Sequence, residues 1–200
     1  MSESTSAIIA PPRAVPDGYR DRLLHAATFV LAVLLFPVAA LRAPGRARYL
    51  ACQWALGLRF PRENLDGLTP GTRAAFTAAR TVAFWRDGQL IGVTSGHRDA
   101  GEQFRLYSAE IRHTGSVSAA RRRVLPPEES SHVRGTALDI RPYAGARWLE
   151  RHGANHDLHR TYDNEWWHFE YIPDSGGRPP LRRAHPGAAP AHHSTHGAGS

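Results

Sequence analysis

Two short polar segments place the strongest constraint on what this chain can fold into. Residues 130–139 read SSHVRGTALD, and residues 165–168 read EWWH. Together the two segments offer two imidazoles and two carboxylates for one site. A catalytic zinc site uses three nitrogen or oxygen ligands, an open position for water, and a nearby general base that does not bind the metal. His132, Asp139 and His168 fit the three ligand positions, and Glu165 fits the base.

Side-chain alternation along two predicted strands, residues 136–140 and 167–172, decides where these groups point. Successive side chains of a strand face opposite sides of the sheet. Asp139 therefore points away from the face on which its apolar neighbours pack, and His168 does the same in the second strand. Glu165 lies before the second strand, so it can approach a metal ion from the side.

The same residues resemble the signature of a known zinc peptidase family. The pattern Ser-x-His-x-x-Gly-x-Ala-x-Asp followed by Glu-x-Trp-His is similar to that of VanY-type D-alanyl-D-alanine carboxypeptidases. The wider kin of these enzymes include VanX-type D-Ala-D-Ala dipeptidases, lysostaphin-like peptidases and the hedgehog domain. The fixed positions are all met, by Ser130, His132, Gly135, Ala137, Asp139, Glu165, Trp167 and His168. A third stretch, Ser95-Gly96-His97-Arg98 followed by Gln103, also resembles the family, although His97 stands where tyrosine is usual.

This resemblance, which covers roughly residues 64 to 172, implies a fold, a cofactor and an activity. The implied fold is α+β, with a small, mostly antiparallel sheet, flanking helices and a zinc cleft on the sheet. The implied cofactor is Zn²⁺, and the implied activity is D-Ala-D-Ala carboxypeptidase action on peptidoglycan stem peptides. Arg98 is then expected to stabilise the tetrahedral oxyanion. The expected substrate contacts are Ser130, Gln103 and Trp167.

Three alternatives share the same ligands. The Trp166-Trp167 pair is closer to the dipeptidases, so a D-Ala-D-Ala dipeptidase stays open. A peptidoglycan endopeptidase of the L-Ala-D-Glu type would use the same chemistry on another bond. A catalytically silent zinc-binding module is the non-enzyme alternative, and the presence of Glu165 counts against it.

An uncharged apolar stretch from Ala26 to Leu41 precedes these motifs and is flanked on both sides by arginines. Its length is near the lower limit for a membrane span of about 20 residues. We predict that residues 20–42 form a transmembrane anchor or a signal segment, with a buried core helix as the third possibility. Because both flanks are basic, charge does not fix the orientation. Because the expected substrate lies in the cell wall, we predict a single-pass membrane protein with an extracytoplasmic catalytic domain, or an enzyme that is secreted after signal cleavage.

Composition divides the rest of the chain. Residues 1–19 are expected to be disordered, residues 43–60 to form a juxtamembrane helix, and residues 61–173 to form the zinc peptidase domain. The domain should hold helices that begin at Thr69 and Asp99, each with an N-cap side chain. The segment from 174 to 200, rich in Pro, Gly and His, is expected to be a disordered tail.

Charge and cysteine content exclude other classes of protein. Twenty-five basic residues, all arginine, and 18 acidic residues give a net charge of +7. Counted from the same sequence, residues 1–59 carry +4, residues 60–178 carry +1, and the remainder carries +2. The predicted domain is therefore nearly neutral, which argues against nucleic-acid binding. A single cysteine excludes an internal disulfide framework. We expect a monomer whose partners are a stem peptide and, through the N-terminal helix, a membrane.

Overall fold

The computed structural model describes residues 18–176 and 179–189 of the 200-residue chain. The helices are α1 (Tyr19–Arg42), α2 (Ala47–Arg59), α3 (Pro70–Asp87), α4 (Ala100–Thr114), α5 (Val117–Ala120) and α6 (Tyr143–His152). Short 3-10 turns are η1 (Pro44–Arg46), η2 (Pro127–Glu129) and η3 (Gly153–His156). The strands are β1 (Gly92–Ser95), β2 (Ala137–Arg141), β3 (Leu158–Arg160) and β4 (His168–Tyr171).

Two helices of the domain, α3 and α4, begin where their capping residues predict. The Thr69 hydroxyl accepts a hydrogen bond from the Thr72 N–H at 3.1 Å, which caps α3. The Asp99 carboxylate accepts one from the Glu102 N–H at 2.8 Å, which caps α4. Such caps satisfy backbone donors that the first turn of a helix leaves without partners. The α6 helix ends at His152, and Gly153 continues in right-handed geometry into η3.

A four-stranded sheet has the order β1-β2-β4-β3, and each neighbouring pair is antiparallel. In the β2–β4 pair, Leu138 lies opposite Phe169 and Asp139 lies opposite His168. The small antiparallel sheet with flanking helices is the expected α+β architecture, and β3 is a strand that the sequence did not predict. The register places one predicted metal ligand directly across from another.

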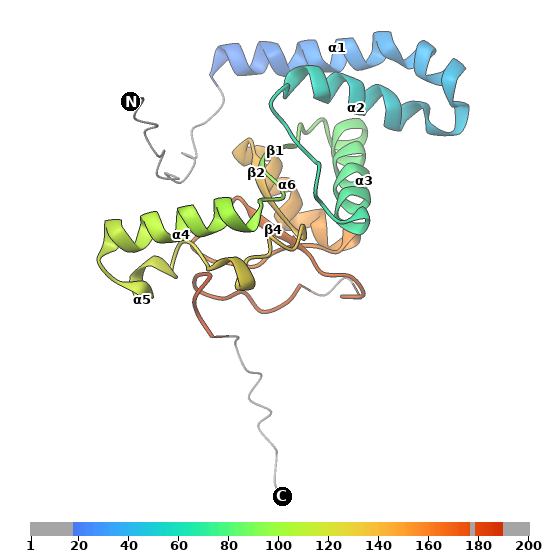
Figure 1. Cartoon of the computed structure of the whole chain (residues 1–200). Helices are drawn as coiled ribbons and strands as arrows, with labels where there is room; N and C mark the ends of the chain where they lie inside the picture. Colours follow the sequence, from blue (N-terminus) through green and yellow to red (C-terminus); the bar gives the residue numbers. More distant parts are fainter. Residues whose placement is uncertain (1–17, 177–178, 190–200) are drawn as a thin grey trace, which may run out of the picture.

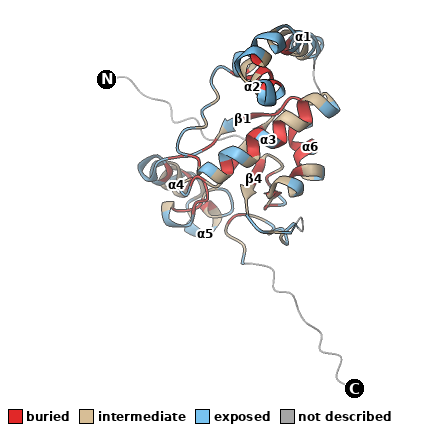
Figure 2. Cartoon of the chain, turned by 90° about the vertical axis from the view of Figure 1, so that its right-hand side faces the viewer, coloured by how far each residue is buried: buried red, intermediate tan, exposed pale blue. Residues whose placement is uncertain are grey.

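The two faces of this sheet differ in chemistry. Leu138, Ile140 and Phe169 point to one face, where they join a buried core with side chains of α3 and α6. Figure 2 shows the buried sides of α3 and α6 turned toward the sheet. Asp139 and His168 point to the opposite face, as strand alternation requires. The apolar core thus supports the strands from behind while the polar face is left for the site.

The N-terminal helix α1 forms an antiparallel hairpin with α2, which in turn packs on α3 (Figure 1). Phe29 of α1 stacks on Phe84 of α3, with ring centroids 4.1 Å apart, and His25 hydrogen-bonds the Gly88 carbonyl at 2.8 Å. The opposite face of α1 is exposed and apolar, with Leu34 at 69% exposure. Among the described residues, α1 is the one helix long and apolar enough to cross a membrane.

The described part of the C-terminal segment lies against the domain. Backbone hydrogen bonds join Arg183 to Thr161 and Asp163, at 2.9 Å each. The expected disordered tail is therefore wrong for residues 179–189, because backbone pairing of this kind leaves no signature in composition. Tyr19, also in the segment expected to be disordered, begins α1, while residues 1–17, 177–178 and 190–200 of the expected disordered ends lie outside the described residues.

Candidate metal centre

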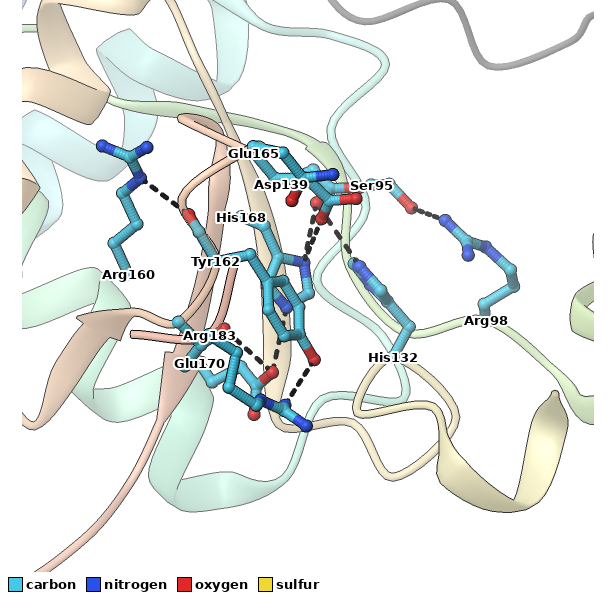
Figure 3. Close-up of polar contacts among 12 residues, drawn as sticks. Ser95, Arg98, His132, Asp139, Arg160, Tyr162, Glu165, His168, Glu170 and Arg183 are labelled. Carbon is cyan, nitrogen blue, oxygen red and sulfur yellow. Dashed lines mark hydrogen bonds and ion pairs between the residues drawn. The ribbon is translucent and has the colours of Figure 1, made fainter. Parts of the chain in front are cut away.

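The three predicted ligands come together above the polar face of the sheet. His132 comes from the turn before β2, Asp139 from β2, and His168 from the start of β4. One ligand atom from each lies within 4.8 Å of the others. The Asp139 Oδ1 is 3.4 Å from His132 Nε2 and 3.3 Å from His168 Nδ1, so these atoms face a common point (Figure 3). This arrangement matches a three-ligand site that keeps one position open.

The second ring nitrogen of each histidine already has a partner. His132 Nδ1 donates a hydrogen bond to the Gly96 carbonyl at 2.7 Å. His168 Nε2 lies 3.1 Å from a carboxylate oxygen of Glu170. Such hydrogen bonds fix the tautomer and the ring orientation of a metal-binding histidine. The donor set therefore fits a zinc ion held by His132 Nε2, Asp139 and His168 Nδ1.

The histidines and carboxylates of the site shift one another's pKa values. Burial opposes the charged form of His168, but hydrogen bonds and attraction from Asp139 and Glu170 raise its pKa to about 10. Burial also works against ionised Asp139, yet attraction and hydrogen bonds from His132 and His168 hold its pKa well below the usual range. The charged form of His168 is thus stabilised by the two carboxylates that it contacts, Asp139 and Glu170.

Glu165 lies beside the ligands without belonging to them. Its Oε2 is 3.9 Å from His168 Nδ1, and the residue is 8% exposed. Burial raises the pKa of Glu165 to about 7, and the nearby carboxylates of Asp139 and Glu170 add to this rise against the opposing His168. A carboxyl group with a pKa close to neutral is suited to taking up and releasing a proton.

Arg98 and Gln103 are brought together at the edge of the same site. Arg98 is buried and donates to the Gln103 side-chain oxygen at 2.7 Å and to the Ser95 hydroxyl at 3.0 Å. The Gln103 amide nitrogen donates to the Leu125 carbonyl at 2.6 Å. Each end of the Gln103 amide therefore has a protein partner, and its oxygen holds the Arg98 guanidinium in place.

A cavity of about 300 Å³ opens above the cluster. Its walls come from α4, the 121–125 loop, the ligand-bearing segments and the C-terminal segment. The predicted site residues that line it are Arg98, Gln103, Ser130, His132, Asp139, Glu165, Trp167 and His168. Trp166, by contrast, packs against the apolar core and against Tyr143, with ring centroids 4.9 Å apart. The two neighbouring tryptophans thus point in different directions, and Trp167 is the one on the cavity.

Tyr162 and Glu170 are site residues to which the sequence analysis gave no role. The Tyr162 ring lies 4.9 Å from the His168 ring at an interplanar angle of 30° and lines the cavity. Glu170 accepts from the Thr161 hydroxyl at 3.1 Å while it contacts His168. The position of Glu170 two residues after His168 on one strand was a readable signal. Tyr162 lies in a loop, and spacing gave no comparable signal for it.

Comparison with known proteins defines the fold. No protein-family model matches the chain, and no curated protein matches its sequence. A crystal structure of the vancomycin resistance D,D-pentapeptidase VanY from a VanB-type cassette, in complex with Zn(II), is 22% identical, with a TM-score of 0.50. That match covers 57% of this chain and 79% of the VanY chain. The LdcB LD-carboxypeptidase is 20% identical, also with a TM-score of 0.50, over 55% of this chain and 61% of its own.

These likenesses confirm the expected α+β architecture, which had been inferred from the motif resemblance alone. Both solved structures are peptidases by description, and one of them holds zinc. The His132, Asp139 and His168 cluster of this chain offers the ligand set that the resemblance implied. The chain therefore has the fold of the VanY and LdcB peptidases and carries, on its sheet, a group of side chains able to hold a metal ion.

Proposed function

We propose that this chain is a zinc-dependent peptidase that acts on peptidoglycan stem peptides, with D-Ala-D-Ala carboxypeptidase as its leading activity. The observation that carries this proposal is the joint presence of three ligand atoms within 4.8 Å of one another and a buried Glu165 beside them. A merely structural zinc site is closed by four protein ligands, whereas this group supplies three. The two solved structures of similar fold are described as D,D- and L,D-peptidases, which supports the substrate class.

The proposed mechanism assigns one task to each residue. His132, Asp139 and His168 would hold the zinc ion, which supplies Lewis-acid polarisation of the scissile carbonyl and a lowered pKa for water. Glu165 takes the proton from the attacking water and passes it to the leaving amine nitrogen. Arg98, fixed by Gln103 and Ser95, stabilises the negative charge that develops on the carbonyl oxygen.

The size of the cavity supports cleavage near the end of a peptide. A volume of about 300 Å³ is at the lower end of the range for small-molecule sites. Such a space suits the last residues of a stem peptide better than the middle of a polymer. Ser130 and Trp167, which both line the cavity, are the proposed contacts to those residues.

A stem-peptide assay tests the proposed activity. The zinc-loaded full chain is incubated with a synthetic pentapeptide stem and, separately, with a tetrapeptide stem, and the products are identified by mass. Loss of one alanine from the pentapeptide supports a D,D-carboxypeptidase, and loss of a dipeptide supports a dipeptidase. Internal cleavage supports an endopeptidase, and cleavage of the tetrapeptide alone supports an L,D-carboxypeptidase. Zinc binding without any product supports the silent module, and hydrolysis that persists in chelator contradicts the metal-dependent mechanism.

We also propose that α1 attaches the enzyme to a membrane. The inner face of α1 is in contact with α2 and α3 from His25 to Ala39, so only its outer, apolar face is available to lipid. Two arrangements remain possible: α1 lies along the bilayer surface on its outer face, or it separates from the domain and forms the predicted single-pass span. Tags at the two chain ends distinguish the arrangements in intact cells: a surface helix leaves both tags on one side, and a span separates them.

A further inference from the structure

The described C-terminal residues 179–189, hereafter the C-terminal strap, run along the segment that leads into the general base. Backbone hydrogen bonds of 2.9, 2.9 and 3.3 Å join residues 183–184 to residues 161–164. A parallel bridge pairs Tyr162 with Arg183. Because residues 161–164 directly precede Glu165 in the chain, the strap fixes the backbone from which the proposed base projects.

Side chains reinforce this contact. The Arg183 guanidinium lies 4.8 Å from the centroid of the Tyr162 ring and donates a hydrogen bond to the Tyr162 hydroxyl at 2.8 Å. Tyr162 in turn stacks on His168, one of the three ligands (Figure 3). An arginine that both stacks on a ring and bonds its hydroxyl restrains the position and the rotation of that ring. Arg183 therefore acts on the metal centre through Tyr162.

The far end of the strap reaches the opposite rim of the cavity. Pro186 is buried and lines the cavity itself. The next residue, Gly187, packs so tightly against the 121–123 loop that an added Cβ would lie 2.8 Å from the Arg121 carbonyl oxygen. The side chain of Asn164 also donates to the Arg122 carbonyl, at 3.1 Å. The C-terminal strap thus extends from residues 161–164 to the 121–123 loop, and Pro186 faces the cavity between them.

We propose that the C-terminal strap is a positioning and specificity element of the active site. It holds Glu165 and Tyr162 in their working positions, and Pro186 walls one side of the cavity around the end of a peptide substrate. The catalytic part of this inference rests on the proposed function. The structural part, that the strap immobilises residues 161–164, is independent of any activity and can be measured on its own.

Two neighbouring arginines give a matched pair of variants. Arg183→Ala removes the contact to Tyr162. Arg182→Ala removes an arginine that pairs with Glu150 at 3.0 Å and, at the longer distance of 4.0 Å, with the Asp163 carboxylate; neither partner lines the cavity. Misplacement of a catalytic group by a fraction of an ångström lowers turnover steeply. We expect Arg183→Ala to lower kcat by about tenfold with KM changed less than about twofold. Arg182→Ala should leave both constants within about twofold of the wild type.

Two further variants separate positioning from general damage. Arg183→Lys keeps one donor for the Tyr162 hydroxyl and should recover part of the lost kcat. Pro186→Gly removes the side chain that lines the cavity but leaves the contacts to residues 161–164 in place. It should therefore raise KM for short stem peptides and leave kcat close to the wild-type value. Hydrogen exchange at the Asp163 and Asn164 amides, which donate to the strap, reports the immobilisation directly in zinc-loaded protein.

The outcomes are distinguishable. Faster exchange at these amides together with a lower kcat in Arg183→Ala, and neither change in Arg182→Ala, supports the proposal. Faster exchange with unchanged kcat and KM overturns the catalytic role. Unchanged hydrogen exchange at these amides in Arg183→Ala overturns the inference that the C-terminal strap immobilises residues 161–164. If the wild type shows no hydrolysis, the proposed function fails, and the exchange data alone then decide whether the strap holds residues 161–164. Equal thermal unfolding of both arginine variants confirms that the comparison is not one of misfolding.

Discussion

Replacement of Glu165 by glutamine tests both the chemistry and the electrostatics of the site. Glutamine keeps the size and the polarity of the side chain but neither ionises nor accepts the proton of water. Loss of a positioned general base costs about 10²–10⁴-fold in turnover. We expect kcat of Glu165→Gln to fall within that range while zinc affinity changes less than about threefold, because Glu165 is not one of the three clustered ligands.

The same variant should be more stable than the wild type in the metal-free state. When the pKa of a carboxyl group is higher in the folded chain than in the unfolded chain, the free energy of unfolding decreases as the pH rises from the lower pKa to the higher one. The pKa of Glu165 is about 7 in the folded chain, against 4.5 for a free glutamate. At about 1.36 kcal/mol per pKa unit, this difference lowers the free energy of unfolding of the wild type by about 3 kcal/mol at high pH. Relaxation of the site reduces this figure, so we expect a gain of about 1–3 kcal/mol at pH 8 and none at pH 4.

Urea denaturation of the metal-free proteins at pH 4, 6 and 8 measures this gain, and a single-turnover assay measures the chemistry. Glu128→Gln, at an exposed glutamate, is the control and should change neither quantity. Activity of Glu165→Gln within fivefold of the wild type would show that another group acts as the base. A stability gain that is the same at pH 4 and pH 8 would show that burial of an ionised Glu165 is not its cause.

Three further predictions address the ligands and the backbone. Glu170→Gln should weaken zinc binding by about 10–100-fold in a chelator competition, because its contact orients His168. The zinc affinity of the wild type should fall by about tenfold for each pH unit as the pH is lowered from 9 to 6, which the same chelator competition measures. The reason is that the metal must displace a proton from His168, whose pKa is about 10. Urea denaturation should give Gly135→Ala a free energy of unfolding at least about 1 kcal/mol lower than that of Gly88→Ala. Both positions have positive φ, but an added Cβ at Gly135 would overlap the Gly67 carbonyl oxygen, whereas one at Gly88 meets no other atom.

The sequence predicted the chemistry of the site better than its surroundings. The sequence identified His132, Asp139, His168 and Glu165 as candidates because metal ligation and proton transfer require particular residue types, and strand alternation orients them. The structure brings these four residues together. The helix starts at Thr69 and Asp99 were readable because capping is a local interaction. Gln103 was predicted to contact the substrate and lines the cavity, but the sequence did not predict that it would also bind Arg98 and the Leu125 carbonyl. Such a role depends on neighbours that are distant in sequence.

By itself, then, the sequence predicted the candidate ligands, the candidate base and the secondary structure that carries them, since each of these follows from residue identity and short-range spacing. Only the tertiary structure decided that Asp139 lies opposite His168, that burial raises the pKa of Glu165 to about 7, and that Pro186 of the C-terminal strap lines the cavity. The physical reason is that strand register, desolvation and backbone pairing arise between segments far apart in the chain. Backbone groups are the same at every position, so composition carries no record of which of them will pair.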